Sequence, residues 1–331
     1  MKSSSYIADN VFGINLEYTK MQNQTKELFF RCLDENRDEE YFENELKKIW
    51  NDSDLDLMQE QILEYREMVH EDNTNKKLSE EAKSKINIVG FAVLSSAVLL
   101  TNKLFQKSKT KEYKIRHESY AYKVDKNEYL KKLVPKYTSD IKPYYKKGEN
   151  KTKENIVRYV KPSTYNSMVY NTTLTKNEWA QTLNDGEELG IDLYYIKSHS
   201  FSCPHCLSHQ ERKMTREECL NIYNTAEEGA TDLLHPNCKC ELVIYEKNTK
   251  LRKIKNKDEK IEQYHIREKV MSLTLKKEEI LSDIKIQKFL GNEDEIDKLN
   301  KQRNKINKSI RELKETLPTT ELKKQVVVRN R

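Results

Sequence analysis

The sequence is poor in residues that form turns and in residues that fill large cores. Its 331 residues include seven Gly, six Pro and two Trp, and 36% are hydrophobic while 34% are charged. This composition is too polar for one large compact core and too poor in turn formers for a β sandwich. Long helices with narrow apolar stripes fit it, so we predict a mainly α fold.

A secretory signal and a disulfide framework are also missing from the pattern. The opening residues, MKSSSYIADN, are polar, and no apolar segment of the kind that a secretory signal needs follows them. Two of the six cysteines, Cys32 and Cys219, stand isolated, which is not typical of a secreted disulfide-rich protein. We therefore expect the chain to fold in a reducing cytoplasm.

Long hydrophobic runs are absent, apart from one uncharged segment. Residues 86–102, INIVGFAVLSSAVLLTN, carry no charge and are bracketed by Lys85 and Lys103. Their length is at the short limit for a membrane-spanning helix, and Gly90, Ser95 and Ser96 suit close helix packing. We expect a helix buried in the protein or in an interface between subunits, with a membrane span as the alternative.

Charge divides the rest of the chain into segments of opposite sign. Lys and Arg minus Asp and Glu give −8 for residues 1–85, +11 for 103–161, −6 for 162–245 and +9 for 246–331. We interpret these as an acidic helical region, a basic Lys/Tyr-rich region, a module with a Cys/His cluster and a basic helical tail, with the uncharged helix at 86–102. The basic segments predict non-specific binding of double-stranded DNA through phosphates, and well-solvated helices are the alternative.

Hydrophobic spacing predicts the helices. Residues 20–50 and 53–71 read as two acidic amphipathic helices, with Trp50 in the packing seam between them, and residues 164–189 as a third that ends at the C-cap glycine Gly190. In the basic tail, a helix containing Ile280 and Ile284 precedes a turn at Gly291. A coiled-coil seam follows, with spacings of three and four, at Ile296, Leu299, Arg303, Ile306, Ile310, Leu313 and Leu317. We expect a helical hairpin or arm whose seam packs on the preceding helix or on another subunit.

Four cysteines and four histidines lie within HSFSCPHCLSH and LLHPNCKC, between His199 and Cys240. Cys203 and Cys206 have the C-x-x-C spacing that directs two thiolates at one ion. Cys238 and Cys240, after 31 intervening residues, form a C-x-C pair, a variant of the usual zinc knuckle. Sulfur and imidazole ligands favour a closed tetrahedral zinc site. We predict ligation by Cys203, Cys206 and Cys238, with either His235 or Cys240 as the fourth ligand.

The cluster is flanked by two predicted strands, in residues 191–200 and 240–246. Between them Thr215 is placed to cap a short helix, TREECLNIYNTAEE, with Cys219 on its apolar face. We expect Cys219 to be a core residue, and the metal to stabilise a sheet too small to be stable alone. The predicted fold is therefore helical domains, a small zinc-stabilised β module and a C-terminal coiled-coil-like arm.

From about Tyr165 onward the sequence resembles the minor capsid proteins of tailed bacteriophages, including the Mu-type head morphogenesis proteins. The resemblance rests on EELGIDLYYIKSHS, SCPHCLSHQ and HPNCKCELVIYE in this order, followed by the charged tail YEKNTKLRKIKNKDEKIE. It covers roughly the last half of the chain, residues 165–331. Such proteins often have glycine after the segment that matches CLSHQ, whereas this chain has Glu211.

The resemblance implies a low-copy structural protein of the virion, in the head interior or the portal region, that resides in the host cytoplasm during assembly. It implies portal and capsid subunits as partners, and roles in head assembly, DNA packaging or DNA ejection. Two alternatives stay open: a zinc-dependent nucleic-acid-binding protein, and a zinc-supported nuclease with His199 or His209 as base and Glu211 nearby. Four sulfur ligands leave no open coordination position, so we expect a protein that is not an enzyme.

Overall fold

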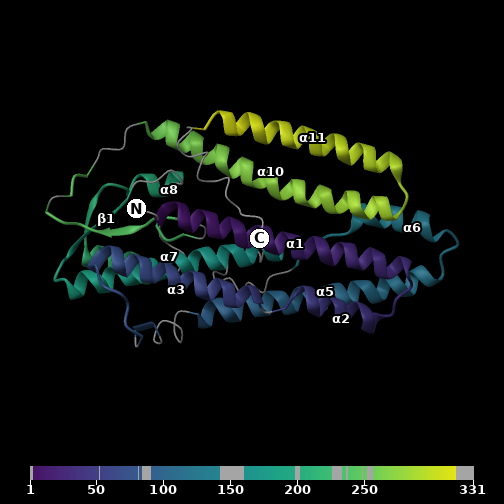
Figure 1. Ribbon diagram of the computed structural model, residues 1–331, viewed down its shortest axis with the longest axis horizontal. Coiled ribbons are helices and arrows are strands. Elements are labelled where there is room, and N and C mark those ends of the chain that lie inside the picture. Colours follow the sequence, from purple (N-terminus) through teal and green to yellow (C-terminus); the bar gives the residue numbers. More distant parts are fainter. Residues whose placement is uncertain are drawn as a thin grey trace, which may run out of the picture.

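The protein is an elongated bundle of helices with a small antiparallel sheet at one end (Figure 1). The computed structural model describes residues 3–51, 53–80, 82–83, 91–141, 160–197, 202–225, 233–235, 238–247, 249–251 and 256–317. The predicted fold class, mainly α with a small sheet, is confirmed within these residues.

The N-terminal region forms three helices where the sequence predicted two. Helix α1 spans Ser3–Asp34, α2 spans Glu39–Ile49 and α3 spans Ser53–Thr74. The prediction of one helix over residues 20–50 is wrong, because Asn36 adopts a left-handed φ of 53° and stops α1. The side chain of Asp38 then caps α2 by accepting a hydrogen bond from the Tyr41 amide at 2.8 Å.

The uncharged segment forms the start of a longer helix, α5 (Ala92–Ala121). Leu94 and Val98 are fully buried, whereas Leu100 is 52% exposed, so this helix packs one face against the body. Ser95 accepts a hydrogen bond from Gln59 of α3 at 3.0 Å. Residues 86–90 of the predicted segment lie outside the described residues. Among the described helices, none has the length and apolar character that crossing a membrane demands.

Aromatic side chains fill the core between α1, α2 and α5. Phe42 and Tyr113 stack with ring centroids 4.3 Å apart, and the Trp50 ring lies 4.6 Å from that of Phe105. Trp50 is 3% exposed, which confirms that it is a packing residue, but its ring contacts lie in α1 and α5 and not in α3 as predicted. Tyr113 and Tyr120 of the basic region are likewise buried and contribute to the packing of this core. Helix α6 (Lys126–Leu133) and the 3-10 helix η1 (Val134–Lys136) close this end of the body.

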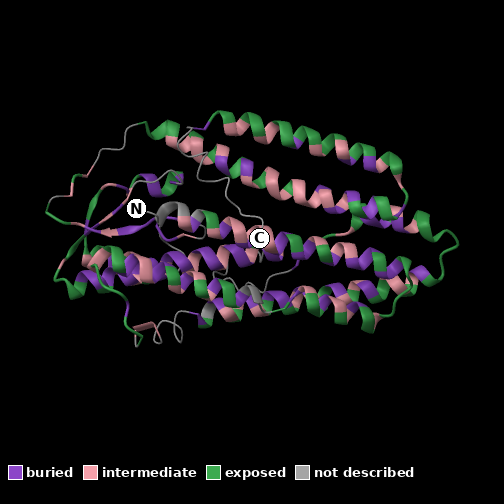
Figure 2. Cartoon of the chain, viewed as in Figure 1, coloured by how far each residue is buried: buried purple, intermediate pink, exposed green. Residues whose placement is uncertain are grey.

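Helix α7 (Pro162–Glu188) connects two cores. Its N-terminal half contributes Tyr170 and Leu174 to the core of the helical body, while Trp179 and Leu183 belong to the core around the sheet. The buried side chains follow most of its length, as Figure 2 shows. Gly190, with φ of 65°, follows its C-cap as predicted, and the Ile191 amide bonds back to the Gly186 carbonyl at 2.8 Å.

The sheet has three strands in the order β2–β1–β3, where two strands were predicted. The central strand β1 (Leu193–Ile196) pairs antiparallel with β2 (Lys213–Thr215) and with β3 (Leu242–Ile244). The short helix α8 (Pro204–Leu207) follows β1, and α9 (Arg216–Thr225) follows β2. Thr215 caps α9 as predicted, in a capping box with Glu218: the Glu218 amide bonds to the Thr215 hydroxyl and the Thr215 amide to the Glu218 carboxylate.

The C-terminal helices α10 (Lys257–Phe289) and α11 (Glu293–Glu315) form the predicted hairpin, with Gly291 at φ of 62° in the turn. The buried seam residues Ile296, Leu299 and Ile306 pack in one cluster with Ile280 and Ile284 of α10. Helix α10 in turn lies along α1, where Lys285 pairs with Glu27 at 3.2 Å (Figure 1). The seam therefore has its partner within this chain.

Candidate metal centre

The C-x-x-C and C-x-C segments meet with His235 in one buried group. Nε2 of His235 lies 3.1 Å from Sγ of Cys203 and 3.3 Å from Sγ of Cys206. Sγ of Cys206 lies 3.6 Å from Sγ of Cys238. All five predicted ligands are thus brought together, in two overlapping groups: Cys203 with Cys206 and His235, and Cys206 with Cys238 and Cys240.

These separations fit a metal ion. A tetrahedral zinc ion with bonds of about 2.3 Å to sulfur and about 2.0 Å to nitrogen puts its ligand atoms roughly 3.5–3.8 Å apart. Within each group the ligand atoms lie within 4.8 Å of one another, and Cys206 belongs to both. Each group supplies three donors around the shared Cys206, and both His235 and Cys240 stay candidates for the fourth position.

Electrostatics favours the ligating form of two thiols. Hydrogen bonding to Cys206 and contact with His235 lower the pKa of Cys203. Hydrogen bonds from Cys206 and Cys240 hold the pKa of Cys238 well below that of a free thiol, even though the side chain is buried. Metal ions bind thiolates and not thiols, so one thiolate in each C-x-x-C and C-x-C pair is prepared for ligation.

The local backbone structure orients the two sulfurs of the C-x-x-C pair. Cys203 is the N-cap of α8, and its Sγ accepts a hydrogen bond from the Cys206 amide at 3.4 Å. Pro204 follows at the first helical position, where its missing N–H costs nothing. One helical turn therefore places both sulfurs on the same side. Leu234, immediately before His235, is held at a left-handed φ of 55°, which is strained for a leucine.

Helix α7 holds the second pair through its side chains. Asn171 and Thr175 both donate hydrogen bonds to the carbonyl of Cys238, at 2.8 Å and 2.9 Å. One turn further on, the indole Nε1 of Trp179 donates to the carbonyl of Cys240 at 2.9 Å. Donors spaced by four residues lie on one face of a helix, so α7 lays the C-x-C segment along that face.

The same face of α7 continues to the start of β3. Glu178 accepts hydrogen bonds from the Leu242 amide at 3.1 Å and 3.3 Å, and Thr182 donates to the Leu242 carbonyl at 3.3 Å. Burial, followed by the neighbouring Glu241, raises the pKa of Glu178 well above its usual value. These side chains satisfy backbone groups of the segment from 238 to 242 that would otherwise be buried without partners.

Other contacts enclose the group. Gln210 approaches the Cys240 sulfur at 3.9 Å and also bonds to Ser202 at 2.7 Å. Tyr264 of α10 packs against the module core, and Lys239 beside the C-x-C pair reaches Glu268 of α10 at 3.7 Å. Cys206, Cys238 and Cys240 are at most 2% exposed. Three of the five candidate ligands are therefore enclosed by the fold, while His235 is only partly buried.

The remaining sequence-predicted residues occupy different places. Cys219 is fully buried in the module core and belongs to neither ligand group, as predicted. His209 and Glu211 lie in the turn between α8 and β2, and His199 lies outside the described residues. Sequence reasoning did not predict that side chains of α7 would form hydrogen bonds to the backbone of residues 238–242. The only signal for these bonds was a helix with polar residues at every fourth position.

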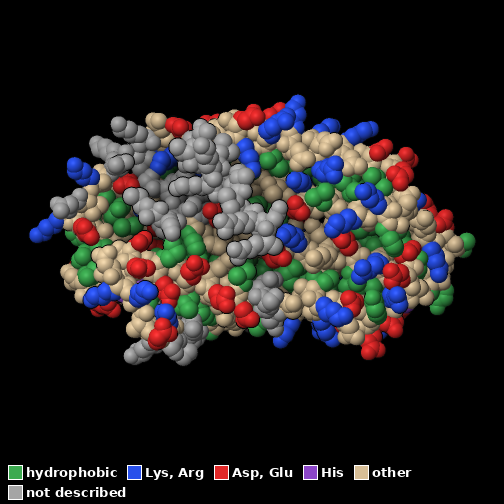
Figure 3. Space-filling view, viewed as in Figure 1, with side chains coloured by type: hydrophobic (Ala, Val, Ile, Leu, Met, Phe, Trp, Pro, Cys, Tyr) green, Lys and Arg blue, Asp and Glu red, His purple; other side chains and the backbone are tan. Residues whose placement is uncertain are grey.

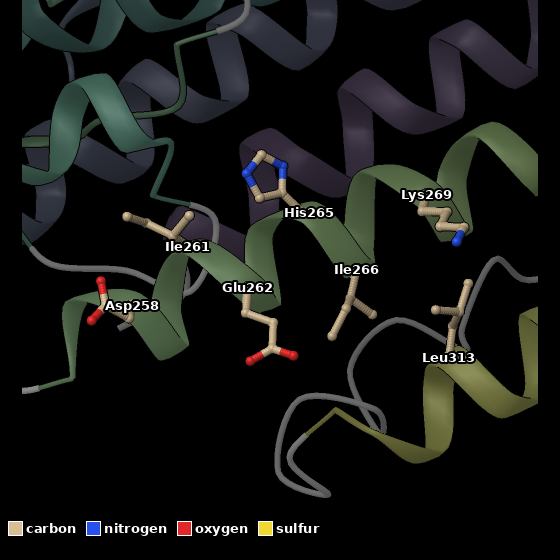
Figure 4. A pocket seen from close by; sticks show the side chains of 7 residues that line it. All are labelled: Asp258, Ile261, Glu262, His265, Ile266, Lys269 and Leu313. Carbon is tan, nitrogen blue, oxygen red and sulfur yellow. The ribbon is translucent and has the colours of Figure 1, made fainter.

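The pocket at the start of α10 offers no second chemical site. One cavity of about 430 Å³ lies between the first turns of α10 and the end of α11, lined by Asp258, Ile261, Glu262, His265, Ile266, Lys269 and Leu313. Figure 4 shows that the His265 ring and the Glu262 carboxylate project from opposite sides of α10 and do not converge. This arrangement lacks the adjacent acid, base and nucleophile that an active site needs.

Comparisons with known proteins add no identification: no family model, no curated protein and no solved structure matches the chain.

Proposed function

We propose that this protein is a minor structural component of a tailed-phage head, located near the portal, in which a metal-bound β module is joined to a helical body. The observation that carries the proposal is the closed thiol–imidazole group, which unites CPHC and HPNCKC and is fixed to α7 by hydrogen bonds. The order of these motifs is the most specific part of the resemblance to minor capsid proteins.

A buried site of this kind serves structure and not catalysis. If the two groups that share Cys206 together supply four ligands to one tetrahedral ion, substrate or water has no place at the metal. Zinc is the ion that this donor set suits best, because soft thiolates and imidazole select it and hard cations prefer oxygen. When bound, zinc would crosslink the loop after β1 to the loop before β3, and α7 would hold that crosslink against the body.

The metal is tested on the full-length protein purified under reducing, chelator-free conditions. Elemental analysis should find about one zinc per chain, and Cys238→Ser should lose it and unfold the module, since a structural zinc contributes roughly 10 kcal/mol in small sites. Cys32→Ser is the matched control, because Cys32 is equally buried but lies in the core of the helical body. Wild-type protein without metal would contradict the proposal.

The role in the head requires virions of the phage that encodes the chain. Mass spectrometry of purified particles should detect the protein in low copy, at a level well below that of the major capsid protein. Particles made after deletion of the gene should show defects in head assembly, DNA packaging or DNA delivery. Absence of the protein from complete wild-type virions would remove the proposed function while leaving the metal centre intact.

The two alternatives differ in what they require. A zinc-dependent nucleic-acid-binding protein accounts for the metal and the basic segments, and it would bind DNA without entering virions. A zinc-supported nuclease requires an open coordination position, and the burial of Cys206, Cys238 and Cys240 speaks against one. Incubation of the zinc-loaded protein with supercoiled DNA separates the two, because only the nuclease would nick it.

A further inference from the structure

The outer face of α11 has a uniform chemical character. Between positions 298 and 311 every exposed side chain is a hydrogen-bond donor, and this stretch contains no carboxylate. The exposed residues are Lys298, Lys301, Gln302, Asn304, Lys305, Asn307, Lys308 and Arg311. We call this set the α11 donor face. Figure 3 shows Lys and Arg side chains along the upper edge of the molecule, where Figure 1 places α11, with acidic side chains towards its ends.

Packing explains why this face is free. The apolar seam of α11, with Ile296, Leu299 and Ile306, faces α10 and is buried there. The residues between the seam positions are therefore turned outward, away from the body. Among the described residues, ion pairs occur only towards the ends of the face, where Lys298 meets Glu295 at 3.0 Å and Lys308 meets Glu312 at 3.7 Å.

The positive charges in the middle of the α11 donor face are poorly balanced by carboxylates. Lys301 and Lys305 make no ion pair with any carboxylate in the described part of the chain, although elsewhere lysines pair with glutamates three or four residues away. Like charges at positions i and i+4 destabilise a helix by about 0.2–0.5 kcal/mol. Lys301 and Lys305 therefore repel each other at a place where one glutamate would relieve the repulsion. A binding partner with negative charge would explain why two lysines stand there.

We infer that the α11 donor face binds the phosphate backbone of double-stranded DNA without reading its sequence. With a rise of 1.5 Å per residue, Lys298 to Lys308 spans about 15 Å, which matches roughly four to five phosphates of one strand at about 3.4 Å of axis each. Lysines act as point charges towards phosphate, and the interleaved amides of Gln302, Asn304 and Asn307 donate to phosphate oxygens.

Other anionic surfaces fit the face less well. An interfacial membrane helix needs apolar side chains opposite its charges to enter lipid, and here the apolar stripe is occupied by α10. A protein partner usually meets a patch with aromatic or aliphatic anchors, and Lys is depleted at such interfaces. The face lies on a different element from the metal ligands, so it does not depend on the head role proposed above.

The test measures binding of the full-length, zinc-loaded protein to a fluorescent 30-base-pair duplex of random sequence at NaCl concentrations from 50 to 300 mM. Lys301→Ala with Lys305→Ala should weaken binding at 50 mM by about tenfold per lysine and reduce the salt slope by about 2, since each phosphate contact contributes about 0.9. The variant should melt at or above the wild-type temperature, because the substitution removes like-charge repulsion.

Lys76→Ala with Lys77→Ala, just after α3, is the matched control, because both lysines are exposed, lie in the acidic region of residues 1–85 and change the net charge equally. The control should keep the wild-type salt slope. If both variants lose binding equally, the effect depends on net charge alone and the inference is overturned. Loss of binding in the control alone would overturn it as well. Binding of wild-type protein to phosphatidylserine vesicles but not to DNA would overturn it as well.

Discussion

Glu211 occupies a backbone conformation that suits glycine. Its φ is 55°, and its amide bonds to the Ile196 carbonyl at 2.8 Å, which fixes the turn between α8 and β2. A residue with a Cβ loses about 1 kcal/mol or more in the left-handed region. Glu211→Gly should therefore raise the free energy of unfolding by roughly 0.5–1 kcal/mol, measured by urea denaturation.

Glu217→Gly provides the control of opposite sign. Glu217 is exposed in the first turn of α9, where a helical glutamate is favourable and glycine costs about 1 kcal/mol. If both substitutions destabilise the protein equally, the side chain of Glu211 contributes interactions that outweigh its backbone strain.

Gly186 permits a close contact between α7 and the sheet. A Cβ at this position would lie 2.1 Å from the Tyr194 hydroxyl oxygen and 2.8 Å from its ring, and Tyr194 is fully buried. Gly186→Ala should lower the free energy of unfolding by about 1–3 kcal/mol, because the ring must move within a packed core.

Gly13→Ala is the counterpart within α1, where no atom lies within 4 Å of an added Cβ. That change should stabilise the protein by roughly 0.5–1 kcal/mol, since alanine is the better helix former. Thermal denaturation of both variants measures the difference, and a neutral Gly186→Ala would show that Tyr194 has room to shift.

At the scale of single residues, sequence spacing predicts the residues whose role depends on near neighbours in the chain. The two cysteine pairs and His235 were identified because C-x-x-C and C-x-C spacing reflects ligand geometry. The hydrogen bonds of Asn171 and Thr175 to Cys238 were not predicted, because they join positions more than 60 residues apart and depend on the tertiary fold. Polar residues in a helix are ordinarily placed on its solvent face, which concealed their role.

Among the elements, α7 is the one that orders the metal centre. Trp179→Phe keeps most of the ring but removes the hydrogen bond from Nε1 to the Cys240 carbonyl. The loss should cost about 0.5–1.5 kcal/mol. It should also speed removal of zinc by a chelator about tenfold or more, as do other changes to groups that orient metal ligands. The rate is followed with a colorimetric zinc indicator.

Trp50→Phe is chemically matched, since Trp50 is 3% exposed and donates its Nε1 to Thr25 at 2.8 Å within the helical body. It should lower stability by a similar amount and leave the rate of zinc release unchanged. Equal acceleration by both variants would mean that global unfolding, and not the contact from α7, controls release.

Element boundaries were predictable where a local signal was strong. The hairpin followed from a seam with spacings of three and four and from Gly291, and α7 from its periodicity and Gly190. The break between α1 and α2 was missed because the apolar spacing continues across it, and only Asn36 and Asp38 mark the turn. Strand β2 was missed because three residues are too few to show alternation, and its pairing with β1 is what defines it.

For the whole molecule, α7 joins the module and the body. On the side facing α3, Gln181 accepts hydrogen bonds from Arg66 at 2.8 Å and 3.2 Å, and Asp185 bonds to His70 at 2.6 Å. These groups are buried, and burial lowers the pKa of the Arg66 guanidinium to about 10. Because the same stretch of α7 holds the C-x-C segment, the metal centre and α3 are linked through one helix.

This link predicts how the protein responds to loss of metal. Chelation under reducing conditions should remove hydrogen-exchange protection from the sheet and from the second half of α7, and then from the last turns of α3 around Arg66 and His70. Helix α11 should keep its protection, because its seam packs on α10. Peptide-resolved exchange and mass spectrometry, with and without chelator, measure all four regions in one experiment. Protection should be lost on both sides of α7, since a shared buried network cannot stay intact on one side only. Loss of protection confined to the sheet would instead show that the module opens independently of the body.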